Sequence, residues 1–455
     1  MASTAYPPGP PTRFPGAHLW VFRRHALEFL CHVSRTYGDV ASFRLGPERV
    51  VLVTHPDAIR DVLVTHHRAF IKARRGDVSK QFLGEGLLNS EGDVHQRQRR
   101  LVQPAFSRQH IAQYAAVMTA YGTRVCQQWQ AGETRDMAQT MAQVTLAIAG
   151  QTFLNIDIDA EVQEIGAAIT TLLQSSTRFN LPFAAFLMKL PLPSNARLRR
   201  AQQHLDTTMY RLIHERRANG GELDDVLSRL LAAQDTLTGT TGMTNKQVHD
   251  EALTLLLAGH ETTAVALTWT WYLLSQYPEA EAKLHAELAT VLDGRTPTDA
   301  DLPCLLYTRQ VFTEAMRLYP PAWMMTRRTL VEYQLGDYTL PAGTFLILSP
   351  YVTHHDPRFF PDPEVFDPER WVAPADTNQP KFAYFPFGGG PRQCLGEGFA
   401  WMEGMLLLAT LAQRWQMRLV LGHPVVPHPL VTLRPRYGMP MTLTPVSGAR
   451  HRPDK

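Results

Sequence analysis

A lone cysteine lies in the glycine-rich stretch Phe387-Gly388-Gly389-Gly390-Pro391-Arg392-Gln393-Cys394-Leu395-Gly396, shortly before an apolar run. Glycine tolerates positive φ and lets a flat ligand approach the backbone, so this loop can turn back on itself and present one sulfur outward. The alternative is a structural cysteine buried in a glycine turn. The four glycines and the arginine around Cys394 favour a role as a metal ligand.

Apolar residues recur at mostly three- and four-residue steps from Gly398 to Trp415, which predicts a helix that begins a few residues after Cys394. Amides at a helix N-terminus stabilise a thiolate. A thiolate that is the only protein ligand leaves the opposite metal position open, which fits a haem iron that activates oxygen.

The pattern Phe387-x-x-Gly390-x-Arg392-x-Cys394-x-Gly396 resembles the haem-binding signature of the cytochrome P-450 family at every fixed position. The resemblance implies that Cys394 is the axial ligand of the iron in haem b, and that Arg392 contacts a haem propionate. A guanidinium suits a buried carboxylate on chemical grounds as well. Phe387 and Gly396 belong to the same expected haem-binding segment.

The bulk composition restricts the function. A length of 455 residues would suggest about three domains at roughly 150 residues each. The motifs between His95 and Cys394 make chemical sense only on one cofactor, so we expect a single catalytic domain at 16–446, a proline-rich lead at 1–15 and a tail at 447–455. A net charge of +3 without a dominant basic tract argues against nucleic-acid binding.

The four cysteines are far apart and form no C-x-x-C pair, so they indicate neither a zinc site nor a disulfide framework. No run reaches the roughly 18 apolar residues that would span a bilayer, and the N-terminus has no signal-peptide pattern. We expect a soluble, cytoplasmic monomer without a membrane anchor.

The secondary-structure pattern is mainly α with a small β region. Helices are expected at 56–64, 93–129 and 244–277, and helical stretches dominate as far as residue 319. The expected strands are at 40–43, 50–54, 333–340, 344–349, 431–433 and 441–444.

The long central helix begins with a capping box at Thr244–Gln247 and would span roughly 45 Å. Its middle, Ala258-Gly259-His260-Glu261-Thr262-Thr263, is a poor helix-forming sequence. Such a sequence can support an opened turn, because a threonine hydroxyl can bond the carbonyl of the preceding turn and let water enter. It resembles the family's central-helix motif over the haem. That likeness implies that Thr262 relays protons, that Glu261 is its acidic neighbour, and that Ala258 and Gly259 make room for oxygen. The alternative is a kinked helix with a solvated Glu-Thr pair.

Glu314 and Arg317 lie three residues apart on one helical face, and Arg370 follows in the Pro368-Glu369-Arg370-Trp371 loop. These elements resemble the family's salt-bridged triad, which we expect to hold the cysteine loop in place. An ordinary surface ion pair is the alternative.

His95 and Arg99 share a helical face and resemble the family's propionate-binding pair, although an exposed basic helix would look the same. Arg327 resembles a further propionate contact, and its neighbour Arg328 leaves that assignment open. Arg97 and Arg100, together with Lys381, would form a basic docking patch for an acidic ferredoxin or flavodoxin. The alternative for these three cations is solvated surface charge. Because no flavin or iron–sulfur module follows the haem segment, electrons from NAD(P)H would arrive through separate reductase and carrier proteins.

The substrate is expected to be a hydrophobic small molecule held in an adaptable apolar pocket. Family position implies pocket roles for Ala258 and for Phe82, Leu83, Leu87, Trp323, Met324, Met325, Tyr437 and Met439. The stretch 179–192, with Phe183, Phe186, Leu187 and Met188, would form a lid. Each pocket residue has a core role as its alternative.

Together these features predict a haem-thiolate monooxygenase that hydroxylates or epoxidises a fatty acid, a terpenoid or steroid, or a macrolide, with O₂ as co-substrate. Two alternatives remain. One is a peroxide-driven haem-thiolate peroxygenase or isomerase, which the Glu261-Thr262 pair disfavours. The other is a non-catalytic haem carrier or gas sensor, for which no second coupled domain is evident.

Overall fold

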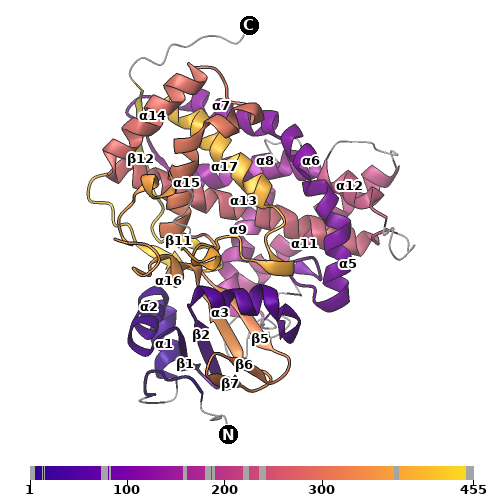
Figure 1. The fold of residues 1–455 in the computed structure, drawn as a ribbon. Helices are drawn as coiled ribbons and strands as arrows, with labels where there is room; N and C mark the ends of the chain where they lie inside the picture. The colour runs from indigo at the N-terminus through magenta and orange to yellow at the C-terminus, as the bar shows by residue number, and fades with distance from the viewer. Residues whose placement is uncertain are drawn as a thin grey trace. The chain divides into compact units, whose positions relative to one another are not determined.

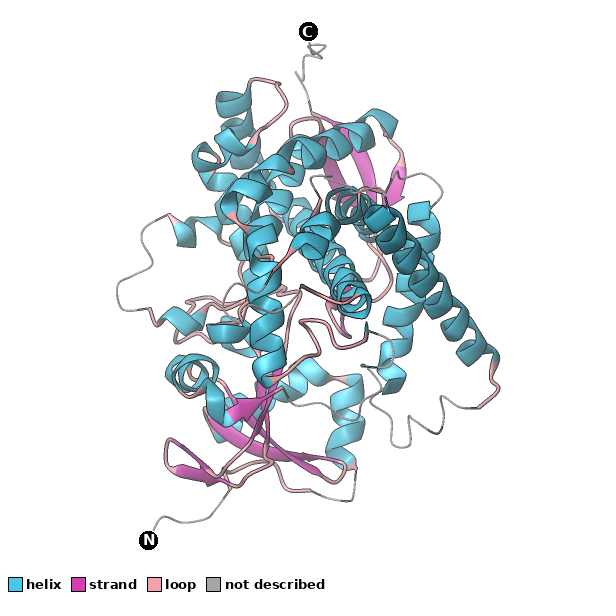
Figure 2. Ribbon diagram, turned by 90° about the vertical axis from the view of Figure 1, so that its right-hand side faces the viewer, coloured by secondary structure: helices cyan, strands magenta, loops and turns pink. Residues whose placement is uncertain are grey.

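The computed structural model describes residues 6–12, 14, 16–72, 80, 83–156, 161–179, 186, 190–218, 225–234, 242–372 and 379–446. Helices make up most of these residues, and the strands form four small sheets (Figure 2). This confirms the expected mainly α class. The chain divides into two compact units. The first comprises Met1–Arg74, Gln310–Cys394 and Pro427–Arg434, and the second comprises Arg75–Arg309, Leu395–Val426 and Pro435–Lys455.

The first unit is built on a five-stranded sheet of order β1-β2-β8-β5-β3. Its strands are β1 (Val40–Leu45), β2 (Glu48–Val53), β3 (Phe70–Ile71), β5 (Met325–Thr329) and β8 (Phe345–Leu348). Strands β2 and β8 pair in parallel, and the other neighbours are antiparallel. Val50–Val53 are all buried because the sheet is covered on both faces: Val50 and Leu52 belong to one hydrophobic cluster, and Val51 and Val53 to another.

Four helices of this unit are α1 (Ala17–Arg24), α2 (Ala26–Tyr37), α3 (Pro56–Arg60) and α16 (Pro350–His354). Figure 1 shows α1 and α2 beside β1 and β2, where Leu30 and Val33 of α2 join the cluster that contains Leu52. The helix expected at 56–64 ends earlier, because a π-helical turn, Asp61–Thr65, replaces its second half.

One expectation for the first unit was wrong in detail. The strand expected at 333–340 is a hairpin of β6 (Tyr333–Leu335) and β7 (Tyr338–Leu340), because Gly336 turns the chain with a φ of 56°. The described part of the proline-rich lead is bound to the sheet, since Ser42 donates from its amide to the Pro8 carbonyl at 2.7 Å and from its hydroxyl to the Pro7 carbonyl at 2.6 Å. The tail at 447–455 lies outside the described residues.

The second unit is a helical assembly. Its helices are α5 (Gly92–Val102), α6 (Arg108–Gln113), α7 (Ala115–Gln128), α8 (Met137–Ala149), α9 (Glu161–Phe179), α11 (Pro193–Ala218), α12 (Val226–Ala232), α13 (Asn245–Gln276), α14 (Pro278–Leu292) and α17 (Glu397–Ala412). Helix α15 (Leu306–Leu318) begins in this unit and ends in the first. The continuous helix expected at 93–129 is interrupted at Pro104 and Ser107 and becomes α5, α6 and α7.

A three-stranded antiparallel sheet completes the second unit, with β4 (Thr134–Asp136), β12 (Pro440–Pro445) and β9 (Trp415–Leu419) in that order. The short strands β10 (Pro427–Pro429) and β11 (Leu433–Pro435) pair with each other. Sequence patterns missed β4, β9 and β10. Strands β4 and β10 have only three residues each. Strand β9 does alternate apolar and polar residues, but it begins at Trp415, the last residue of the expected helix, whereas α17 ends at Ala412.

Helix α13 confirms the expected central helix. The Thr244 hydroxyl accepts from the Gln247 amide, and the Gln247 side chain accepts from the Thr244 amide. The helix has 32 residues, about 48 Å at 1.5 Å per residue. It continues without interruption through Ala258–Thr263, so the sequence does not open a turn there.

Candidate active site

The cysteine loop has the shape that its glycines predict. Gly388 and Gly390 have φ values of 72° and 67°, and the Cys394 amide donates to the Phe387 carbonyl at 2.9 Å. A Cβ on Gly390 would lie 2.0 Å from the carbonyl oxygen of Leu63, so no other residue fits at this position without displacing the backbone. Cys394 is exposed. An exposed cysteine on a closely packed glycine loop suits a single thiolate ligand, and the residues therefore fit a haem.

The expected triad is present in the first unit. Nε and Nη2 of Arg317 donate to the two carboxylate oxygens of Glu314 at 2.8 and 2.7 Å, and both side chains are fully buried. Nε of Arg370 donates to Oε1 of Glu314 at 3.3 Å. Arg317 also donates to the carbonyls of His354, Pro363 and Val365, at 2.9, 2.7 and 3.1 Å. A buried pair needs such additional bonds to offset the loss of water.

Two contacts around the triad were not predicted. The indole of Trp371 donates to Oε2 of Glu314 at 2.8 Å. The ring of His354 accepts from the Phe385 amide through Nε2 at 3.1 Å, and it stacks on Tyr384 with 5.0 Å between ring centroids. Because His354 also accepts from Arg317 through its carbonyl, one residue joins the triad to the segment that leads into the cysteine loop.

In the structure, Arg327 and Arg328 make different contacts. Arg328 donates to the Gly343 carbonyl at 2.7 Å and to the carboxylate of Glu48 at 3.1 Å, and its guanidinium lies over the ring of Phe345. Arg327 is buried, and its Nη1 donates to the Thr326 carbonyl at 2.9 Å. Since Arg328 is held by Glu48, this arrangement favours Arg327 for the propionate contact.

The centre of α13 has accessible side chains between two mostly buried stretches. Nearly all of its other residues past the first turn are buried, whereas Ala258 is exposed, and Leu257, Gly259 and Thr262 are half-buried. Oγ1 of Thr262 donates to the Ala258 carbonyl at 3.0 Å, which is the bond that the sequence predicts. Glu261 is buried beside His260, with 4.0 Å between Oε2 and Nε2. The side chains of Glu261 and Thr262 leave the helix about 100° apart, so they face different surroundings.

Gly259 of α13 also makes room for a side chain that packs against the helix. A Cβ on Gly259 would lie 2.6 Å from the ring of Phe153, so the glycine admits this aromatic side chain. The role of Gly259 toward oxygen stays a prediction. Thr145 of α8 was not predicted as part of this region. Its buried hydroxyl donates to the His260 carbonyl at 2.9 Å and holds α8 to the middle of α13.

The remaining candidates for haem binding and for docking belong to different units. His95 is buried on α5, and Arg99 is half-buried one turn later. Gly396 directly precedes α17 in the second unit, whereas Phe387 and the half-buried Arg392 belong to the first. Arg97 and Arg100 belong to the second unit and Lys381 to the first, so the basic docking patch stays a prediction.

The candidate pocket residues have different surroundings. Trp323 belongs to a hydrophobic cluster of the first unit, and its indole donates to the Leu430 carbonyl at 2.9 Å. Met439 is fully buried in the second unit. These placements favour core roles for both residues. Leu83, Leu87, Met324 and Met325 are half-buried, and Tyr437 is exposed. Phe82 and most of the expected lid at 179–192 lie outside the described residues.

A buried acid on α17 was also missed. Glu403 is completely buried, and burial raises the pKa of its carboxyl well above the ordinary value, with only partial opposition from the Thr263 hydroxyl. Because apolar residues surround Glu403 on both sides in the sequence, the pattern does not predict whether its side chain faces the core or the solvent.

The comparisons with known proteins agree with this geometry. The family model for cytochrome P450 matches residues 7–438. Cyclooctatin synthase of Streptomyces melanosporofaciens is 41% identical over 91% of both chains. Cyclooctat-9-en-7-ol 5-monooxygenase of the same organism is 39% identical over 89% of this chain and 88% of its own. Pentalenene oxygenase of Streptomyces avermitilis is 36% identical over 91% and 92%.

A solved structure shares the fold. The retinoic-acid-bound cyanobacterial CYP120A1 superimposes with a TM-score of 0.85 over 98% of this chain and 100% of its own, at 26% identity. The chain belongs to the cytochrome P450 family and is a monooxygenase. Among the described residues, the structure contains no helix with the length and hydropathy to cross a membrane.

Proposed function

We propose that this protein hydroxylates a cyclic terpenoid with O₂, using a haem whose iron is bound by Cys394. The observation that carries the substrate class is the similarity, over about nine-tenths of the chain, to three proteins named cyclooctatin synthase, cyclooctat-9-en-7-ol 5-monooxygenase and pentalenene oxygenase. Of the three classes that the sequence leaves open, these relatives support the terpenoid.

The chemistry divides between cofactor and protein. Bound haem supplies oxygen activation, and a thiolate ligand favours cleavage of the O–O bond. Cys394 would supply the thiolate. Arg392 and Arg327, with His95 and Arg99, would neutralise the two propionates, and Phe387 and Gly396 would flank the ring.

Thr262 and Glu261, at the centre of α13, would deliver protons. Thr262 presents its hydroxyl on the accessible part of the helix, and its bond to the Ala258 carbonyl holds Oγ1 in a defined position. Glu261 is buried on another side, so a proton that passes between them needs a water molecule or a change of rotamer. Ala258 and Gly259 would leave space for the oxygen molecule.

The candidate pocket residues are Leu83, Leu87, Met324 and Met325, together with Phe82 and Tyr437. Leucine and methionine give a rigid cyclic hydrocarbon close contact without strong directional demands. Trp323 and Met439 are left out of this set because they are packed in hydrophobic cores.

Electrons would come from NAD(P)H through a reductase and an acidic ferredoxin or flavodoxin that docks on Arg97, Arg100 and Lys381. We expect a cytoplasmic monomer. Added salt should weaken the docking, because it screens exposed charges.

The test is reconstitution of the haem-loaded protein with NADPH, ferredoxin and ferredoxin reductase. We expect pentalenene or cyclooctat-9-en-7-ol to shift the iron from low to high spin and to yield a hydroxylated product with oxygen from ¹⁸O₂. Turnover only with peroxide would replace this proposal with a peroxygenase, and a spectrum without a thiolate-ligated carbonyl complex would overturn it. Binding of a fatty acid or macrolide but of no terpenoid would refute the substrate class.

A further inference from the structure

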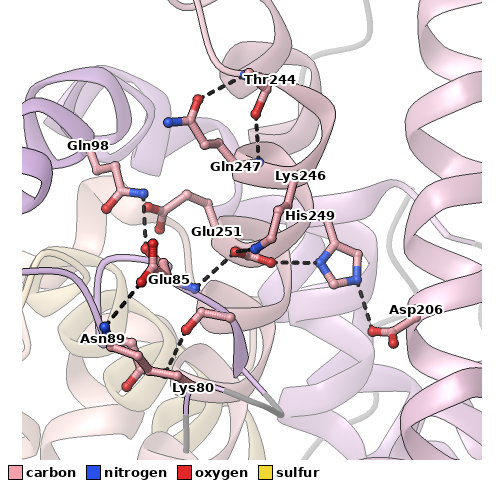
Figure 3. A network of polar contacts seen from close by, with 12 residues as sticks. Lys80, Glu85, Asn89, Gln98, Asp206, Thr244, Lys246, Gln247, His249 and Glu251 are labelled. Carbon is pink, nitrogen blue, oxygen red and sulfur yellow. Dashed lines mark hydrogen bonds and ion pairs between the residues drawn. The ribbon is translucent and has the colours of Figure 1, made fainter. Parts of the chain in front are cut away.

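A loop and a helix of the second unit are joined by two hydrogen bonds from backbone amides to carboxylates (Figure 3). The Glu85 amide donates to Oδ2 of Asp250, and the Leu87 amide donates to Oε2 of Glu251, both at 2.9 Å. Asp250 and Glu251 lie in the second turn of α13 and are buried. The loop, residues 83–90, is called the 83–90 loop below.

The loop approaches the helix as closely as glycine allows. Gly84 has a φ of 58°, and a Cβ there would lie 2.2 Å from the carboxyl carbon of Asp250. A Cβ on Gly86 would lie 2.4 Å from Oγ1 of Thr254. The two glycines therefore let the loop backbone lie directly on Asp250 and Thr254.

The loop is also fixed from its other side. Nδ2 of Asn89 donates to the Gly84 carbonyl, and Nε2 of Gln98 on α5 donates to the Glu85 carbonyl, both at 3.0 Å. Figure 3 shows Gln98, Asn89 and Glu85 on one side of this network and His249 with Asp206 on the other.

Asp250 is held in turn by a histidine that bridges two helices. The ring nitrogens of His249 lie 3.0 Å from Oδ1 of Asp250 and 3.0 Å from Oδ1 of Asp206 on α11. The ring stacks on Tyr210 of α11 at 4.6 Å and 14°. The network thus connects α11, α13 and the loop.

The position of this network on α13 relates it to the active site. Thr254, which touches Gly86, precedes Ala258 by four residues and lies on the same helical face. Glu251 precedes Ala258 by seven residues, about 10 Å along the axis. The loop therefore meets α13 one to two turns before its accessible centre.

We propose that Asp250 and Glu251 are positioning residues that fix the 83–90 loop on α13 and thereby set which substrates the pocket accepts. This inference rests on the proposed function, in which Leu83 and Leu87 border that pocket. The two carboxylates do not touch the substrate. They act through the backbone of the loop.

The first test measures hydrogen–deuterium exchange in the haem-loaded protein. Asp250→Ala and Glu251→Ala should each accelerate exchange of the 83–90 amides at least tenfold, because each removes an acceptor. Glu251→Gln keeps an acceptor oxygen and should exchange like the wild type. Asp225→Ala is the matched control: Asp225 is equally buried in the same unit, where it accepts from the Ser228 amide and pairs with Arg216. It should leave the 83–90 amides protected.

The second test measures pocket shape without the natural substrate. Imidazole and 4-phenylimidazole bind haem iron directly, and they differ in the space they need beside it. The alanine variants should change the ratio of their dissociation constants at least fivefold, and Glu251→Gln should restore the wild-type ratio. Where Glu251→Ala does not incorporate haem, Glu251→Asp, which retracts the carboxylate by one methylene, should show the same changes.

The inference is overturned if exchange of the loop amides does not change, if exchange accelerates while the azole ratio stays constant, or if Asp225→Ala shifts the ratio as much. These readouts do not need terpenoid turnover. A wild type that oxidises no terpenoid, combined with the expected azole results, would refute the proposed function and leave the loop inference standing.

Discussion

The Phe385 amide donates to Nε2 of His354 at 3.1 Å, although the two residues are 31 positions apart in the chain. Burial lowers the pKa of His354 well below its ordinary value, so the ring is neutral and Nε2 can accept. The carbonyl of the same residue accepts from Arg317. His354 therefore contacts the buried triad through its backbone and the segment that leads into the cysteine loop through its ring.

His354→Ala should lower the haem content and the unfolding free energy, the latter by about 2–4 kcal/mol, because it leaves the Phe385 amide unpaired and a cavity beside Tyr384. The control is His355→Ala, since His355 is also buried but donates from Nδ1 to the Tyr351 carbonyl at 2.7 Å rather than contacting the cysteine-loop segment. Haem content and the reduced carbonyl spectrum check this. Equal loss of haem in both variants would contradict the proposed link.

Within the triad, we expect the loss of haem and of stability to be larger when the residue left without its partner is more deeply buried. Glu314→Ala should abolish haem incorporation, because it leaves the fully buried Arg317 without its carboxylate, a loss of about 3–5 kcal/mol. Arg370→Ala should cost less, since Arg370 keeps 15% of its side chain exposed and has one bond of 3.3 Å to Glu314. Chemical denaturation and haem titration would rank the two variants, and a haem-loaded Glu314→Ala protein would refute the structural role.

Thr262→Ala should uncouple reductant use from product formation by about tenfold or more, because it removes the hydroxyl at the centre of α13. Thr268→Ala is a matched control: Thr268 makes the same type of bond, to the Ala264 carbonyl at 2.7 Å, but is buried further along the helix. The ratio of product to NADPH consumed measures the effect. Wild-type coupling in Thr262→Ala, or equal uncoupling in both variants, argues against a relay.

Glu403→Gln should raise stability at neutral pH. The folded-state pKa of Glu403 is raised above the ordinary 4.5, so folding takes up a proton, and wild-type stability falls as the pH rises past 4.5. The glutamine variant lacks this loss and should be more stable by about 1–3 kcal/mol near pH 7.5, with no difference near pH 4.5. Thermal unfolding of both proteins across this range measures it. A constant difference at every pH would show that Glu403 does not titrate this way.

The sequence alone predicted the features that depend on residues close together in the chain. Positive φ at Gly388 and Gly390, the capping box of Thr244 and the spacing of Glu314 and Arg317 are local, so residue type and spacing predict them. The start of α17 shortly after Cys394 followed from its apolar periodicity in the same way. The thiolate role of Cys394 and the relay role of Thr262 stay predictions.

Tertiary structure decided what depends on distant partners. His354 meets Phe385, Thr145 meets His260, and Asp250 meets Glu85 because the fold brings together segments that no spacing relates. Trp323 is a core residue for the same reason: an apolar side chain suits a pocket and a core equally, and only its neighbours distinguish the two. Local patterns specify backbone conformation and helical faces, whereas burial and pairing follow from three-dimensional packing.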